Sequence, residues 1–270
     1  MKKAYITVLL AIMYIPIALV IAYSFNESRF SSAWSGFSLN WYRELLRDRA
    51  IFEALRNSFF LAAISSFAAA VIGTMGAVGI SRSGRFSKII EYLSVLPIMT
   101  PEIILGMVLL AFFSLLGLPL GMLTLVLAHT CFCIPYVYLL VRARLAGLNK
   151  SYTEAARNLG SGTWKVFLDI TLPLIMPAVI SGMLLSFAMS FDDVIISIFV
   201  TGSRTNTLPV RIYTQLKTGV TPKTNALCSL LFIITVLLCI LSAAVSRIRL
   251  PGYSMEKKQE MDRKADIDET

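Results

Sequence analysis

Residues 151–173, SYTEAARNLGSGTWKVFLDITLP, decide the fold, because they place strong helix signals in a polar segment between two long apolar stretches. Ser151 followed by Glu154 predicts a capping box, in which the two side chains bond backbone N–H groups at the start of a helix. This helix is expected to run to Leu159. Gly160 then supplies the left-handed conformation that commonly follows a helix.

A second short helix is predicted directly afterwards. Thr163 is expected to cap a helix through residues 164–169, and Pro173 fits the first turn of a new apolar helix. The segment is therefore predicted to be a helix–turn–helix of about 20 residues. Ala155 and Ala156 lie on its surface, where small side chains allow another protein to approach closely.

The composition outside this segment is that of a membrane protein. Of the 270 residues, 56% are hydrophobic and 15% are charged, and the mean hydropathy is +0.72. Soluble domains carry about 25% charged residues, so an ordinary soluble enzyme, a disordered chain and a disulfide scaffold are excluded. The net charge of +9 is interpreted as a topology signal, and no nucleic-acid partner is expected.

An all-α fold with six transmembrane helices is predicted, because six apolar stretches approach the roughly 20 residues that a span requires. The first follows Met-Lys-Lys and resembles a signal peptide, but its 22 apolar residues exceed a typical signal core, which favours a retained helix. The third is expected to be broken by prolines. The six stretches are residues 4–25, 58–80, 89–118 (broken by Pro97 and Pro101), 122–141, 174–190 and 227–245.

Positive charge places both termini in the cytoplasm. This topology puts 16 Lys and Arg residues on the inner side and 9 on the outer side, which satisfies the positive-inside rule. We divide the chain into a first helix and outer loop (1–56), a core (57–245) and a charged tail (246–270). The polar segment, at about 150–171, is then cytoplasmic.

The polar segment resembles the EAA loop of ABC-importer permeases. The resemblance rests on the spacing of Glu154-Ala155-Ala156, Gly160, Ile170 and Leu172-Pro173. It implies a type I ABC-importer permease (MetI-like) fold in the bacterial cytoplasmic (inner) membrane. It also implies that Glu154, Ala155, Ala156 and Gly160 contact a cytoplasmic ABC ATPase dimer.

The chain has no ATP-hydrolysing motif of its own. It has no Gly-x-x-x-x-Gly-Lys-Ser/Thr phosphate loop and no catalytic motif, so we expect no enzyme activity. We expect the partner ATPase to use ATP and this chain to bind no cofactor or metal. A secondary transporter or a channel, which needs no ATPase, is the alternative from another functional class.

Three acids in apolar surroundings indicate what crosses the membrane. They are Glu102, Asp192 and Asp193. An acid at the centre of a span costs about 2.5–3.5 kcal/mol on insertion scales, so these side chains should face a polar path. A path lined by carboxylates favours a cationic substrate. Ser190 is expected to add a hydrogen bond.

These residues also have structural interpretations. Asp192 or Asp193 could cap a helix, or pair with Arg204 or Arg211. Trp41 could bind an ammonium group through its ring, but its position favours an interfacial anchor of an amphipathic segment.

His129 and the cysteines are interpreted as structural. His129 is expected to be a hydrogen-bonded histidine within the membrane. Cys131, Cys133, Cys228 and Cys239 show no spacing typical of a zinc site.

A wider resemblance links residues 5–245 to spermidine/putrescine (PotC-type) permeases. It implies polyamine transport through a path that includes Glu102, Asp192 and Asp193, with Ser190 and Trp41 as further candidates. It also implies a second, PotB-type permease subunit and a periplasmic or extracytoplasmic polyamine-binding protein. An opine, another amine, iron or thiamine is the alternative substrate. The matching motifs are Asn40-Trp41-Tyr42, Ser190-Phe191-Asp192-Asp193-Val194, Phe199-Val200-Thr201-Gly202 and Asn225-Ala226-Leu227.

Overall fold

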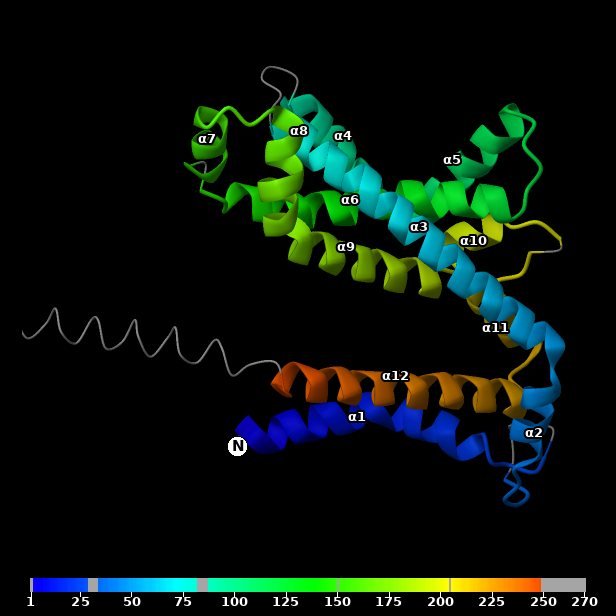
Figure 1. Ribbon diagram of the computed structural model, residues 1–270. Coiled ribbons are helices and arrows are strands. Elements are labelled where there is room, and N and C mark those ends of the chain that lie inside the picture. The colour runs from blue at the N-terminus through cyan, green and yellow to red at the C-terminus, as the bar shows by residue number, and fades with distance from the viewer. Residues whose placement is uncertain (1, 29–33, 82–86, 150, 204, 249–270) are drawn as a thin grey trace, which may run out of the picture. The chain divides into compact units, whose positions relative to one another are not determined.

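The computed structural model describes residues 2–28, 34–81, 87–149, 151–203 and 205–248, which form helices joined by turns and loops, with no strand among them. The predicted tail beyond residue 248 and Arg204 lie outside the described residues. The chain divides into a terminal unit, Met1–Arg47 with Thr218–Thr270, and a central unit, Asp48–Lys217. Figure 1 labels the helices of both units.

The terminal unit is built from three helices. Helices α1 (Lys2–Tyr23) and α12 (Pro222–Ile248) contact each other, and α2 (Asn40–Arg47) contacts α12. An ion pair of 3.1 Å between Lys223 Nζ and Glu44 Oε1 joins α12 to α2. The predicted amphipathic segment around residue 41 is therefore a helix of this unit.

Three helices pack around one another in the central unit, namely α3 (Arg49–Ser81), α6 (Met122–Ala146) and α9 (Leu172–Asp192). Glycines bring α3 and α9 close to α6 at Val137. A Cβ on Gly73 would lie 3.0 Å from Val137 Cβ, and a Cβ on Gly182 would lie 3.0 Å from Val137 Cα. Small residues at such crossings are how membrane helices achieve close contact.

The predicted break in the third apolar stretch is confirmed. Helix α4 (Ser87–Met99) and helix α5 (Glu102–Leu115) meet at an angle of 110°. Pro101 separates them, because a proline disfavours helical backbone in the residue before it and donates no N–H. Pro97, by contrast, lies inside α4. The short helix α10 (Ile195–Val200) contacts α5, and α11 (Leu208–Thr218) follows it.

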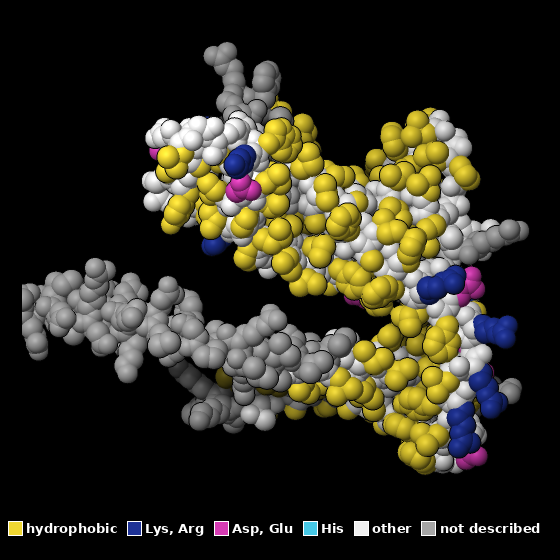
Figure 2. All heavy atoms as spheres, in the orientation of Figure 1, with side chains coloured by type: hydrophobic (Ala, Val, Ile, Leu, Met, Phe, Trp, Pro, Cys, Tyr) yellow, Lys and Arg dark blue, Asp and Glu magenta, His cyan; other side chains and the backbone are white. Residues whose placement is uncertain are grey.

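Four described helices are long and apolar enough to cross a membrane, and the bent pair α4–α5 counts as a fifth. Three of these spans exceed the predicted limits. The second begins at Arg49, the fourth ends at Ala146, and the fifth begins at Thr163. In α12, the part whose side chains are described without a gap is the apolar helix Pro222–Leu237, which is shorter. Figure 2 shows apolar side chains along the visible length of the central helices, as a lipid or protein neighbour requires.

Candidate functional site

The polar segment ends its first helix as predicted. Helix α7 (Ser151–Asn158) is followed by Gly160, whose φ is +82°. The Gly160 N–H donates to the Arg157 carbonyl at 2.9 Å, and the Ser161 N–H donates to the Ala156 carbonyl at 3.1 Å. These two bonds form a Schellman motif, which satisfies carbonyls that the end of the helix leaves open.

The predicted caps of this segment are wrong in detail. Ser151 is the first residue of α7, and its N–H and hydroxyl donate to Asn149 Oδ1 at 3.0 and 2.7 Å. Asn149 therefore organises the start of α7, because asparagine readily accepts from the backbone two residues further on. Thr163 likewise opens α8 (Thr163–Val166) from inside, and the extended Gly162 occupies the cap position.

The second helix of the segment does not end before the next span. Helix α8 continues through a π-helical turn, η1 (Phe167–Thr171), into α9, so that Thr163–Asp192 forms one helical unit. Pro173 lacks the N–H that would bond the Asp169 carbonyl, and this makes the ladder irregular without ending the helix. The predicted boundary at Pro173 is therefore a change of helix type.

Three of the four predicted ATPase contacts lie on the surface. Glu154, Ala155 and Gly160 are exposed, whereas Ala156 is only 8% exposed and faces inward. Beside them the side chain of Leu159 is 86% exposed, which is unusual for leucine unless a partner covers it.

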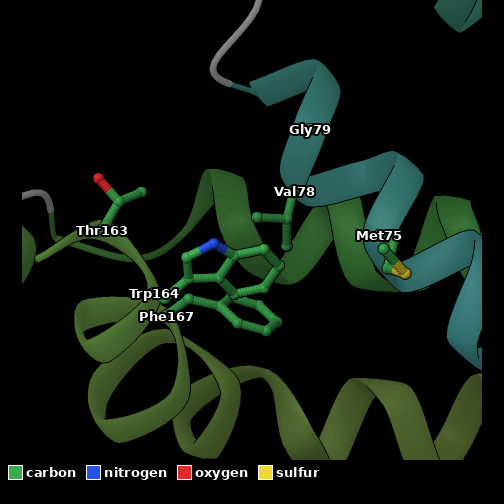
Figure 3. A pocket seen from close by; sticks show the side chains of 6 residues that line it. All are labelled: Met75, Val78, Gly79, Thr163, Trp164 and Phe167. Atoms are coloured by element: carbon green, nitrogen blue, oxygen red, sulfur yellow. The ribbon is translucent and has the colours of Figure 1, made fainter.

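An apolar cavity of about 300 Å³ lies where this segment meets α3. Figure 3 shows the rings of Trp164 and Phe167 together beneath Val78. The two rings meet edge to face, with centroids 6.2 Å apart. Trp164 is 73% exposed, whereas Phe167 packs against the core of the central unit. The lining residues are Met75, Val78, Gly79, Thr163, Trp164 and Phe167.

The predicted acids lie toward the other end of the central unit, with α5 and α10 (Figure 1). Glu102 is the first residue of α5 and is half-buried, and it lies within electrostatic range of Asp193. Asp192 is the last residue of α9 and is exposed. Helix α9 has 21 residues, about 30 Å, so it extends over one hydrocarbon thickness between the polar segment and Asp192.

Asp193 has a structural role. It is 8% exposed, and its carboxylate accepts from the Ile196 N–H at 3.2 Å and from the Ser197 N–H at 2.8 Å. It therefore caps α10, one of the two structural interpretations of the sequence. Of the two arginines predicted as partners, Arg211 pairs with Asp48 at 3.7 Å, and Arg204 lies outside the described residues.

His129 is the partner that the sequence did not assign to Asp193. Its Nε2 lies 3.4 Å from Asp193 Oδ2 and 3.0 Å from Ser197 Oγ, and its Nδ1 lies 2.8 Å from Ser190 Oγ. The prediction of a hydrogen-bonded structural histidine is confirmed. Ser190, only 2% exposed, is occupied by this bond. The sequence did carry a signal for this cluster, because one apolar stretch contains three polar residues near its end, namely Ser190, Asp193 and Ser197.

Trp41 belongs to the terminal unit. Its indole N–H donates to the Asn26 carbonyl at 2.7 Å, and the hydroxyls of Ser24 and Tyr42 lie 2.7 Å apart nearby. The indole nitrogen is therefore occupied by the turn that follows α1. The described cysteines, Cys131, Cys133 and Cys228, are free thiols.

The sequence matches a known protein family over about two thirds of its length. Residues 69–251 match the model of the family described as "Binding-protein-dependent transport system inner membrane component". The chain belongs to this family. The permease is 37% identical over 248 residues to the spermidine/putrescine transport system permease protein PotC of Haemophilus influenzae, covering 92% of this chain and 96% of that protein. It is 43% identical over 227 residues to the putrescine transport system permease protein PotI of Escherichia coli, covering 81% of each.

Solved structures confirm the fold of the permease. A chain of the bacterial ABC transporter involved in alginate import matches with a TM-score of 0.69 at 13% identity, covering 92% of this chain and 95% of that chain. A chain of the MetNI methionine ABC transporter matches with a TM-score of 0.62 at 17% identity, covering 78% and 97%. The permease thus has the MetI-like fold of ABC importers.

Proposed function

We propose that this permease is one of two pore-forming subunits of an ABC importer for polyamines, with spermidine and putrescine as substrates. The observation that carries the proposal is the 36–43% identity to PotC and PotI permeases over most of the chain. In this proposal a PotB-type subunit supplies the other half of the pore. A polyamine-binding protein delivers the substrate from outside.

In the proposed membrane arrangement, six spans cross the bilayer and both termini are cytoplasmic. The bent pair α4–α5 is one span and α12 is the last. The asymmetry of Lys and Arg between the two sides supports this orientation. Helices α7 and α8 then lie in the cytoplasm.

Coupling to a cytoplasmic ATPase dimer runs through the polar segment. Glu154, Ala155 and Gly160 are proposed to contact the ATPase, with Leu159 as an added apolar contact. ATP binding and hydrolysis occur in that partner, so this chain needs no cofactor. Because α8, η1 and α9 are continuous, a movement of α8 reaches Asp192 without crossing a loop. This connection suits alternating access, in which a pore opens first to one side and then to the other.

Recognition of the substrate is proposed to use the accessible carboxylates. Glu102 and Asp192 can pair with protonated amines, because neither is fully buried. Asp193 and Ser190 act on the path through the hydrogen bonds already described. Trp41 is proposed to contribute from the outer loop, where an aromatic ring suits an ammonium group.

Uptake in cells tests this function. Cells that lack their own polyamine importers should take up labelled spermidine only when the complete system with this permease is expressed. Excess unlabelled putrescine should compete, and an uncharged polyol of similar length should not. If uptake is insensitive to putrescine but is blocked by another cationic solute, the protein is still an importer permease, but its substrate is that other solute.

A further inference from the structure

The buried cluster around His129 joins three helices. His129 belongs to α6, Ser190 to α9, and Ser197 to α10, and all three side chains are at most 2% exposed. Asp193 completes the cluster in the link between α9 and α10. A buried polar group that lacks partners is destabilising, so a cluster of this kind persists only when its hydrogen bonds are satisfied.

Counting donors assigns a direction to these bonds. An ionised Asp193 only accepts, so the Ser197 hydroxyl donates to Asp193 Oδ2 at 2.9 Å. Ser197 Oγ then accepts from His129 Nε2–H at 3.0 Å. With its proton on Nε2, the neutral imidazole accepts from the Ser190 hydroxyl at Nδ1, at 2.8 Å.

Helix α10 depends on this chain of bonds. It has only six residues, too few for a helix that is stable alone. At its start it is held by Asp193 and Ser197. At its end the Thr124 hydroxyl donates to the Val200 carbonyl at 2.9 Å. Between these points Phe199 lies against Gly106 of α5.

We propose that His129 is a positioning residue for the substrate path. The bond from its Nε2 to Ser197 holds α10 to α6. Helix α10 in turn packs through Phe199 against Gly106 of α5, the helix that begins at Glu102. His129 thereby fixes the spacing between the Glu102 and Asp192 carboxylates without touching the substrate. This inference rests on the proposed polyamine function, because it treats these two carboxylates as amine-binding groups.

Two substitutions distinguish the hydrogen bond made by Nε2 from the one made by Nδ1. Gln carries its terminal amide at about the depth of Nε2, so His129→Gln keeps a donor for Ser197. Asn carries its amide at the depth of Nδ1, so His129→Asn keeps only the Ser190 contact. Cys133→Ala is the matched control. Cys133 lies one turn along α6 and is equally buried, and its thiol bonds the Ser186 carbonyl of α9 at 3.4 Å.

The experiment measures uptake of spermidine and of putrescine by the complete importer, per amount of assembled complex. We expect His129→Gln and Cys133→Ala to stay within about threefold of wild type, and His129→Asn to lose about tenfold, the usual effect of losing a buried bond in a charged network. The ratio of spermidine to putrescine uptake should also change about threefold in His129→Asn, because altered carboxylate spacing discriminates between chains of different length.

Equal uptake by the Gln and Asn variants would overturn the proposal. So would a loss in His129→Asn that affects both amines in proportion, since this indicates a purely structural role. A wild-type complex that imports a different cation contradicts the polyamine function instead. In that case the His129 variants are compared with that cation and its shorter and longer analogues.

Discussion

Phe199 lies so close to Gly106 that a Cβ on position 106 would be 2.6 Å from Phe199 Cδ2. This contact joins α10 to α5 at a point four residues after Glu102. The absence of a side chain at Gly106 therefore sets how near the capped helix α10 comes to the bend in the broken span.

Replacing Gly106 by Val is expected to push Phe199 and α10 away from α5. Overpacking a tight contact costs about 1–3 kcal/mol, so polyamine uptake should fall about tenfold. Gly76→Ala is the control, because a Cβ there meets only Tyr138 Cδ2, at 4.0 Å. Labelled-spermidine uptake per assembled complex is the measurement, and equal uptake by the two variants would contradict the account.

Gly160 is expected to accept Asn but not Val. At φ +82° a β-branched residue is strained by about 1–2 kcal/mol, whereas Asn tolerates this conformation. Gly160→Val should weaken retention of the ATPase during purification in mild detergent, and Gly160→Asn should preserve it. Retention of the ATPase by both variants would show that the Schellman turn is not needed for docking.

Ala155 and Ala156 are adjacent but differ in exposure, so they distinguish docking from folding. Ala155→Trp should abolish ATPase retention while the thermal stability of the permease stays unchanged, because the side chain is exposed. Ala156→Trp should lower thermal stability as well, since position 156 is 8% exposed. Melting in detergent and co-purification are compared for both. An unchanged complex with Ala155→Trp would remove this residue from the proposed interface.

The acids at the end of α9 are expected to respond differently to the same substitution. Asp192→Asn should reduce polyamine uptake about tenfold without changing stability, because it removes an exposed charge from the path. Asp193→Asn should lower the free energy of unfolding by about 1–2 kcal/mol, because it weakens charged hydrogen bonds to α10. Thermal melting and uptake are measured for both variants. Equal melting losses would contradict the assignment of Asp193 as the cap.

Sequence patterns predicted the helical class, the break at Pro101 and the turn at Gly160, because each depends on a local backbone preference of proline or glycine. The same local reasoning placed the caps wrongly at Ser151 and Thr163. Neighbouring Asn149 competes for the first N–H groups, and Gly162 adopts the cap geometry without a side chain.

The two aspartates show what local reasoning cannot supply. Asp192 and Asp193 are neighbours in sequence, and their roles separate because α9 ends between them and turns Asp193 inward. Its partner His129 is 64 residues away in the sequence, on a helix that meets α10 only in the folded chain. Contacts between distant segments of this kind follow from tertiary packing and not from spacing.

The most direct test of polyamine import uses proteoliposomes that contain the permease with its second subunit and ATPase, with ATP enclosed and the loaded binding protein outside. Labelled spermidine should accumulate inside with ATP and should not accumulate with a non-hydrolysable analogue. Accumulation is also predicted to fall about tenfold when Asp192→Asn replaces the wild-type chain. Accumulation without ATP, or hydrolysis stimulated by the binding protein with no spermidine entering, would contradict the account.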